Sequence, residues 1–98
     1  MESKVMSEDV LAVFQRKDLS WSAKATYLGV WYFDQGEGCQ ENKETIGKTV
    51  GLSAGQVYLG LRELVDAGIL SREPRGAGQT NIYRSLIARD INADPPHA

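Results

Sequence analysis

The sequence predicts an α+β fold that is mostly helical: a three-helix core, then a two-stranded antiparallel hairpin, with room for an extra short N-terminal helix. Three observations within residues 42–86 carry this prediction. Two short amphipathic patterns are joined by the turn Val50-Gly51-Leu52-Ser53. Another glycine, Gly68, ends the second pattern. Two strand-like runs then flank a glycine-rich turn, so the order is helix, turn, helix, strand, glycine loop, strand.

Two helical patterns precede this region. Glu8 and Asp9 can begin a short helix, because carboxylates suit the positive end of a helix dipole. Ser20 or Ser22 then begins a longer helix, about residues 22–34. Helical spacing predicts one buried face on this helix, made of Ala25, Leu28, Trp31 and Tyr32, with Tyr27, Val30 and Phe33 widening it. We expect these aromatic side chains to form core rather than a ligand pocket.

The central pair of helices has clear start and stop signals. Asn42 is a natural N-cap for a helix over residues 43–50, which buries Ile46 and Val50. Gly51 suits the left-handed position after that helix. Ser53 then caps a helix that Gly68 ends. Its apolar residues fall at positions i, i+4, i+7 and i+8, and they are Val57, Leu61, Leu64 and Val65.

A β-hairpin follows these helices. Residues 69–73 and 80–86 read as strands, and Pro74 suits a strand end rather than a central position. Residues 75–79 form the glycine-rich turn, and residues 35–40 form another loop without periodicity.

The length of 98 residues suits one domain. We expect residues 1–18 to be an N-terminal arm or short helix, residues 19–87 to form the domain, and residues 88–98 to be a disordered tail. No apolar run approaches the ~20 residues that span a bilayer, and the N-terminus lacks a signal-peptide core, so a cytoplasmic protein is expected. Cys39 and His97 are the only cysteine and histidine. We therefore expect no disulfide, metal site or cofactor, and Cys39 to be inert or a flexible-loop thiol.

Charge distribution permits a nucleic-acid partner without demanding one. The net charge is −2, which counts against such a partner. Residues 41–86 nevertheless hold six lysines and arginines against five acidic residues, and their arginines gather around the predicted hairpin.

Several motifs together carry a family resemblance over residues 19–86. They are Leu19-Ser20, Ala23-Lys24, Gly51-Leu52-Ser53, Ala67-Gly68-Ile69-Leu70, and Asn81 with Tyr83. The chain resembles bacterial and phage winged helix-turn-helix DNA-binding domains, of the kind found in plasmid replication initiators and mobile-element regulators. The resemblance implies that the second motif helix and the wing bind double-stranded DNA. One departure is that this helix begins Ser53-Ala54-Gly55-Gln56, where such domains are usually rich in Arg, Lys, Thr or Gln.

The candidate DNA-binding residues lie on the two motif helices and around the wing. They are Lys43, Lys48, Ser53, Gln56, Tyr58, Arg62, Arg72, Arg75 and Gln79. An amide such as that of Gln56 can pair with adenine, and Tyr58 can stack or donate to a phosphate. The first-helix lysines and Arg62 suit phosphates, and an arginine beside the wing can enter the minor groove. The alternative for the charged residues is simple solvation, and Arg84 is expected to be structural.

The leading hypothesis is a DNA-binding protein of a plasmid, phage or other mobile element. It would act as a transcriptional regulator or replication-associated factor, as a homodimer that reads two half-sites. The alternative is a winged-helix protein–protein module: an adaptor, an anti-repressor, or a phage inhibitor of a host nucleic-acid machine. We do not expect an enzyme, because the chain lacks a spare histidine or cysteine, and Glu41 with Glu44 reads as a solvated helix start.

Overall fold

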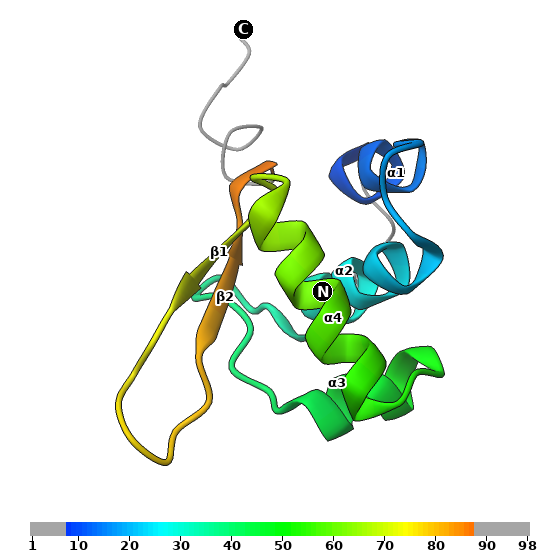
Figure 1. The fold of residues 1–98 in the computed structure, drawn as a ribbon. Coiled ribbons are helices and arrows are strands. Elements are labelled where there is room, and N and C mark those ends of the chain that lie inside the picture. The colour runs from blue at the N-terminus through cyan, green and yellow to red at the C-terminus, as the bar shows by residue number, and fades with distance from the viewer. Residues whose placement is uncertain (1–7, 88–98) are drawn as a thin grey trace, which may run out of the picture.

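The computed structural model describes residues 8–87, which form four helices followed by two strands. The helices are α1 (Glu8–Phe14), α2 (Trp21–Phe33), α3 (Lys43–Val50) and α4 (Ala54–Asp66), and the strands are β1 (Leu70–Glu73) and β2 (Ile82–Ser85). The predicted class, α+β and mostly helical, is confirmed, and α1 is the extra N-terminal helix (Figure 1). The tail, residues 88–98, lies outside the described residues. The division of the chain at residue 18 stays a prediction.

Helix α2 is the centre of the packing, since α1, α3, α4 and β2 all contact it. Its Tyr27 is fully buried, and the phenol bridges three elements. The hydroxyl lies 2.7 Å from Ser85 Oγ on β2 and donates to Asp9 Oδ2 on α1 at 3.3 Å. Burial raises the pKa of Tyr27 to about 12, because desolvation penalises the phenolate.

The predicted buried face of α2 is right for Tyr27 and Val30 and wrong for Tyr32. The fully buried apolar positions are Ala23, Tyr27 and Val30, whereas Tyr32 remains 54% exposed. Ala25, Leu28 and Trp31, also assigned to the buried face, are only partly buried. Apolar residues occupy nearly every side of this helix, so spacing alone does not select the side that faces the core.

The predicted helix boundaries hold closely, because they depend on local capping. Ser20 Oγ accepts the Ala23 N–H at 3.1 Å, and Asn42 Oδ1 accepts the Thr45 N–H at 2.8 Å. Helix α3 ends at Gly51, whose φ of +82° lies in the left-handed region that favours glycine. The turn between α3 and α4 is therefore built as the sequence indicates.

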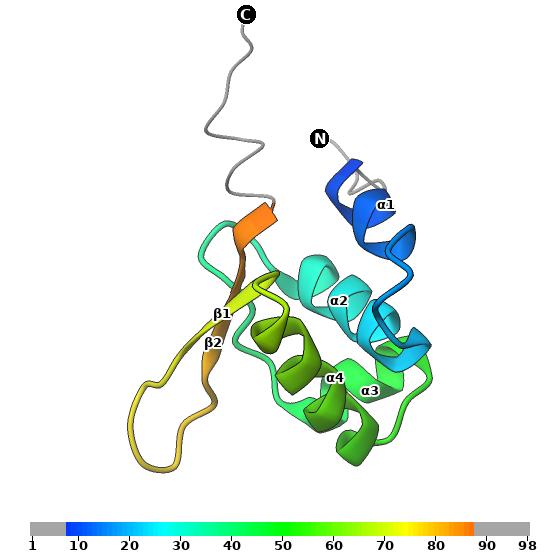
Figure 2. The same ribbon diagram turned by 45° about the horizontal axis from the view of Figure 1, so that its top comes forward.

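The strands pair in antiparallel register, from Leu70 opposite Ser85 to Glu73 opposite Ile82. Both are shorter than predicted, and residues 74–81 form the connecting loop. In both views this loop lies at the same end of the molecule as the first turn of α4 (Figures 1 and 2). The hairpin begins after the C-terminal end of α4 and extends away from the helices (Figure 1).

A pairing that the sequence did not reveal fastens the 35–40 loop to the hairpin. Cys39 and Tyr83 form an antiparallel bridge, with N–H to O distances of 2.8 and 3.0 Å. The Cys39 side chain is fully buried, so its interpretation as a flexible-loop thiol is wrong. Burial raises the pKa of this thiol, which disfavours the reactive thiolate. None of the helices described here has the length and apolar character needed to cross a membrane.

Candidate nucleic-acid interface

The turn between α3 and α4 fixes the direction in which α4 leaves the core. The backbone N–H groups of Gly51 and Leu52 both donate to the Gly47 carbonyl, at 2.7 and 2.9 Å. A Cβ at Gly47 would collide with the Leu52 carbonyl, so the turn can fold back this tightly only over a glycine. The two helices are consequently held as one rigid unit.

Helix α4 has an inner and an outer face. The inner face, defined by Val57, Gly60, Leu61 and Leu64, is buried against α2, α3 and β1. The outer face, defined by Gly55, Tyr58, Leu59 and Arg62, is exposed. Tyr58 is 47% exposed and Leu59 60% exposed, although both are large and apolar. The outer face therefore presents apolar surface that no other element covers.

The first turn of α4 uses its polar side chains for its own cap. Ser53 Oγ accepts the Gln56 N–H at 3.1 Å, and Gln56 Oε1 accepts the Ser53 N–H at 2.9 Å. This reciprocal capping box satisfies two helix N–H groups. The sequence indicated both residues as DNA contacts, with Gln56 facing a base. The structure engages both side chains within the protein, and leaves the Gln56 amide nitrogen as the group that can still turn outward.

The predicted cations of the helix pair are exposed. Lys43 and Lys48 lie on α3, and within residues 8–87 neither pairs with an acidic side chain. On α4, the Arg62 guanidinium lies over the Tyr58 ring, 5.9 Å from its centroid. Arg62 thus keeps a positive charge on the outer face beside the exposed aromatic ring.

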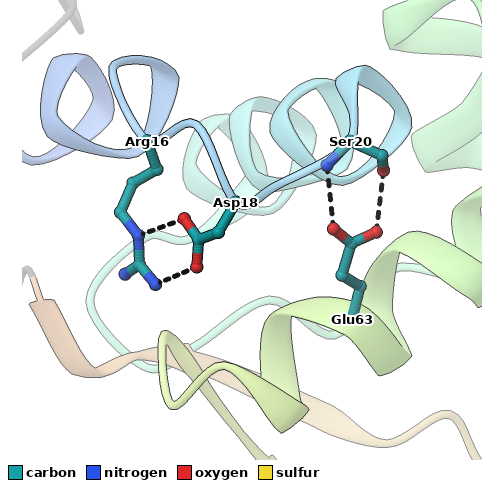
Figure 3. Close-up of polar contacts among 4 residues, drawn as sticks. All are labelled: Arg16, Asp18, Ser20 and Glu63. Carbon is teal, nitrogen blue, oxygen red and sulfur yellow. Dashed lines mark hydrogen bonds and ion pairs between the residues drawn. The ribbon is translucent and has the colours of Figure 1, made fainter.

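Glu63, the neighbour of Arg62, is turned away from the outer face. Its two carboxylate oxygens accept from Ser20, one from the backbone N–H at 2.8 Å and one from the hydroxyl at 2.7 Å (Figure 3). This pair of hydrogen bonds joins the start of α2 to the last turn of α4. From Ala54 to Arg62, α4 carries no acidic side chain, and Arg62 is the charged residue of that stretch. The exposed Asp66 follows one turn later.

Of the three candidate residues around the hairpin loop, one is hydrogen-bonded through its side chain within the protein, and the side chains of the other two form no such bond among residues 8–87. The Arg75 guanidinium donates to the Thr80 carbonyl and hydroxyl at 2.8 and 2.9 Å and to Gln40 Oε1 at 3.2 Å. These bonds brace the loop against the 35–42 segment, a role that the sequence did not suggest. Arg72 and Gln79 remain exposed. As expected, Arg84 is structural: it pairs with Glu73 across the strands at 3.2 Å.

A hollow of about 280 Å³ separates the hairpin loop from the helix pair. Lys43 of α3, Leu61 of α4 and Gln79 of the loop all line it. Two candidate residues from separate segments, Lys43 and Gln79, therefore border one recess. Arg62 and Tyr58 lie outside this lining, on the outer face of α4.

Two residues of this surface were not among the predicted DNA contacts. Leu59 and Gly55 are both exposed on the outer face, between positions that were singled out. The signal was present, since a buried stripe at Val57, Leu61 and Leu64 places Leu59 on the opposite side of the helix. A leucine on the outward side is informative when neighbouring outward positions are also apolar.

Among residues 8–87, no group of three or more histidine, cysteine, aspartate or glutamate side chains is placed to hold a metal ion. Comparisons of the chain with protein-family models, with curated proteins and with solved structures found no match.

Proposed function

We propose that this protein is a winged helix-turn-helix protein that binds double-stranded DNA. In this proposal α3 and α4 form the helix-turn-helix, α4 enters the major groove with its outer face, and the β1–β2 loop is the wing. The observation that carries it is the exposed outer face of α4, together with a projecting hairpin loop at the same end of the molecule as the first turn of α4 (Figures 1 and 2). An α-helix fits the width of the major groove, and such a helix must be exposed along one side.

Phosphate contacts would come from four cations around α4. Lys43, Lys48, Arg62 and Arg72 are exposed, and none of them forms an ion pair among the described residues. Phosphate contacts position a protein on DNA and make its affinity depend on salt. Arg75 would act indirectly by holding the wing in shape through Thr80 and Gln40.

In a cell, such a protein would act in the cytoplasm as a transcriptional regulator or replication-associated factor of a plasmid, phage or other mobile element. We further propose that it works as a homodimer. One short helix contacts few base pairs, and two copies reading half-sites about one DNA turn apart supply the missing specificity.

Fluorescence anisotropy with a mixed-sequence duplex, titrated between about 50 and 200 mM salt, tests this proposal. We expect the logarithm of the binding constant to fall linearly with the logarithm of the salt concentration, with a slope of roughly −3 to −4 for four phosphate contacts. Replacing Lys48 by Glu (Lys48→Glu) removes one contact and should make that slope shallower by about one unit.

The matched control is Lys17→Glu, which reverses an exposed charge between α1 and α2, away from the proposed interface. We expect its salt slope to equal that of the wild type. An absence of binding at the lowest salt, or equal losses for Lys48→Glu and Lys17→Glu, would rule out the proposed interface.

A protein–protein module is the second candidate, and the exposure of Tyr58 and Leu59 favours it. Exposed aromatic residues are enriched in protein interfaces, and the outer face carries little charge. The two candidates differ in their response to salt. A protein complex centred on Tyr58 and Leu59 would survive Lys48→Glu and would lack the steep salt dependence of phosphate binding.

A further inference from the structure

The first turn of α4 offers few hydrogen-bonding side chains that could read bases, and Tyr58 and Arg62 follow only in later turns. Ser53 and Gln56 bond to each other's backbone in the capping box. Bidentate pairing with adenine needs both the oxygen and the nitrogen of a glutamine amide. Because the Gln56 oxygen already accepts from Ser53, the cap restricts the direction in which the amide can face a base. The first turn of α4 therefore has few side-chain groups that could read bases through hydrogen bonds.

Gly55 lies in this first turn, and nothing around it requires a glycine. A Cβ there would meet only Ser53 Oγ, at 3.9 Å. At Gly60, by contrast, a Cβ would lie 2.5 Å from Thr26 Oγ1 and 3.0 Å from the Ser22 carbonyl, so close packing against α2 demands the glycine. An exposed helical glycine weakens a helix relative to alanine. Packing does not explain Gly55, and the space beside it is open to a close approach from outside the described fold.

The surface next to Gly55 is apolar and has one positive charge beside it, that of Arg62. Leu59 and Tyr58 are 60% and 47% exposed, and Arg62 lies over the Tyr58 ring. No carboxylate occurs on α4 before Glu63, which is bonded to Ser20. Such a face complements a partner whose surface combines apolar groups with flanking negative charge. The major groove offers that combination, because the thymine methyl group is its apolar feature and phosphates border it.

We infer that the outer face of α4 reads thymine methyl groups, through van der Waals contact of Leu59 and Tyr58, and so prefers A·T base pairs. This inference rests on the proposed function, because it assigns the base preference of the same site. Gly55 lets the helix approach the base edges closely, and the cations around α4 hold the flanking phosphates. Specificity then comes from shape and apolar contact rather than from hydrogen bonds.

The test leaves the protein unchanged and removes only the thymine methyl groups of the DNA. Anisotropy titrations compare an A·T duplex with the same duplex in which 2′-deoxyuridine replaces every thymidine. Each lost methyl contact should weaken binding about fourfold, so that two contacts give roughly a tenfold loss or more. A G·C duplex with 5-methylcytosine restores a methyl group in the major groove, and it should bind more tightly than its unmethylated form.

Leu59→Ala should reduce the thymine-to-uracil affinity ratio toward one. The matched control, Leu11→Ala, removes a leucine of similar exposure from α1 and should retain the wild-type ratio. Equal binding of the thymine and uracil duplexes by the wild type would overturn the inference and leave the proposed function standing. A full ratio in Leu59→Ala would also overturn it. Failure to bind any duplex at low salt would end both proposals.

Discussion

The two faces of α4 contain the same kinds of residue, yet only one face is explained by the fold. Leu64 and Gly60 on the inner face are buried, and their sizes are set by α2 and the rest of the core. Leu59 and Gly55 on the outer face are exposed, and nothing in the described fold fixes their size. Within one helix, packing therefore accounts for one leucine and one glycine and does not account for the other pair.

This difference separates residues that stabilise the fold from residues that are proposed to bind a partner. Inner-face substitutions should change the free energy of unfolding. Outer-face substitutions should change binding and leave stability nearly unaltered. Matched pairs of the same residue type make this contrast measurable.

The largest contrast is expected for the leucines. Leu64→Ala should lower the free energy of unfolding by about 2–5 kcal/mol, because it removes a fully buried side chain and leaves a cavity. Leu59→Ala should change it by less than about 0.5 kcal/mol. Urea unfolding followed by circular dichroism measures both values. A large loss for Leu59→Ala would mean that the outer face is part of the core.

The glycines should change stability in opposite directions. Gly60→Ala should destabilise by about 1–3 kcal/mol, because the new methyl group crowds Thr26 and the Ser22 carbonyl. Gly55→Ala should stabilise by up to ~1 kcal/mol, since alanine favours a helix and the space is open. Thermal unfolding of both variants checks the signs. If Gly55→Ala stabilises the fold but weakens DNA binding, the glycine serves the partner.

The tyrosines give a smaller contrast. Tyr27→Phe should cost about 1–2 kcal/mol, because Asp9 and Ser85 each lose a buried hydrogen-bond partner. Tyr58→Phe removes an exposed hydroxyl and should leave stability within about 0.5 kcal/mol. Chemical denaturation of the two variants side by side provides the comparison. Equal costs would show that the Tyr27 bridge contributes nothing specific.

Alkaline pH should produce the smallest effect. The folded pKa of Tyr27 is raised to about 12 from an ordinary 10, so its contribution is fully present below pH 10 and is lost as pH rises through 12. This linkage amounts to about 1 kcal/mol between pH 10 and 11. Denaturation at both pH values should show a steeper loss in the wild type than in Tyr27→Phe. Parallel losses would contradict a buried, neutral phenol.

Features that depend on nearby residues were predictable from the sequence. Asn42, Ser53 and Gly51 cap or end helices through contacts within a few residues, and their predicted roles are confirmed. The buried face of α2 was only partly predictable, because apolar residues surround that helix and the choice depends on its neighbours. The Cys39–Tyr83 bridge joins residues far apart in the chain, so no local pattern marks it.

The candidate site shows the same division. Its helices and cations could be located from spacing and charge. The bracing of the hairpin loop by Arg75 depends on Thr80 and Gln40, and Gln40 lies 35 residues away along the chain. Hydrogen bonds between residues that are distant in the sequence determine which polar side chains remain available to a ligand. Local sequence patterns do not reveal such bonds.

The central claim is that the outer face of α4 binds duplex DNA, and Arg62 tests it most directly. Anisotropy titrations of wild type and Arg62→Glu with one mixed-sequence duplex at low salt should show binding that weakens at least about tenfold in the variant, because the substitution replaces a phosphate contact with repulsion. The unfolding free energies of the two proteins should agree. Undetectable binding by the wild type, or equal affinities for both proteins, would contradict the account.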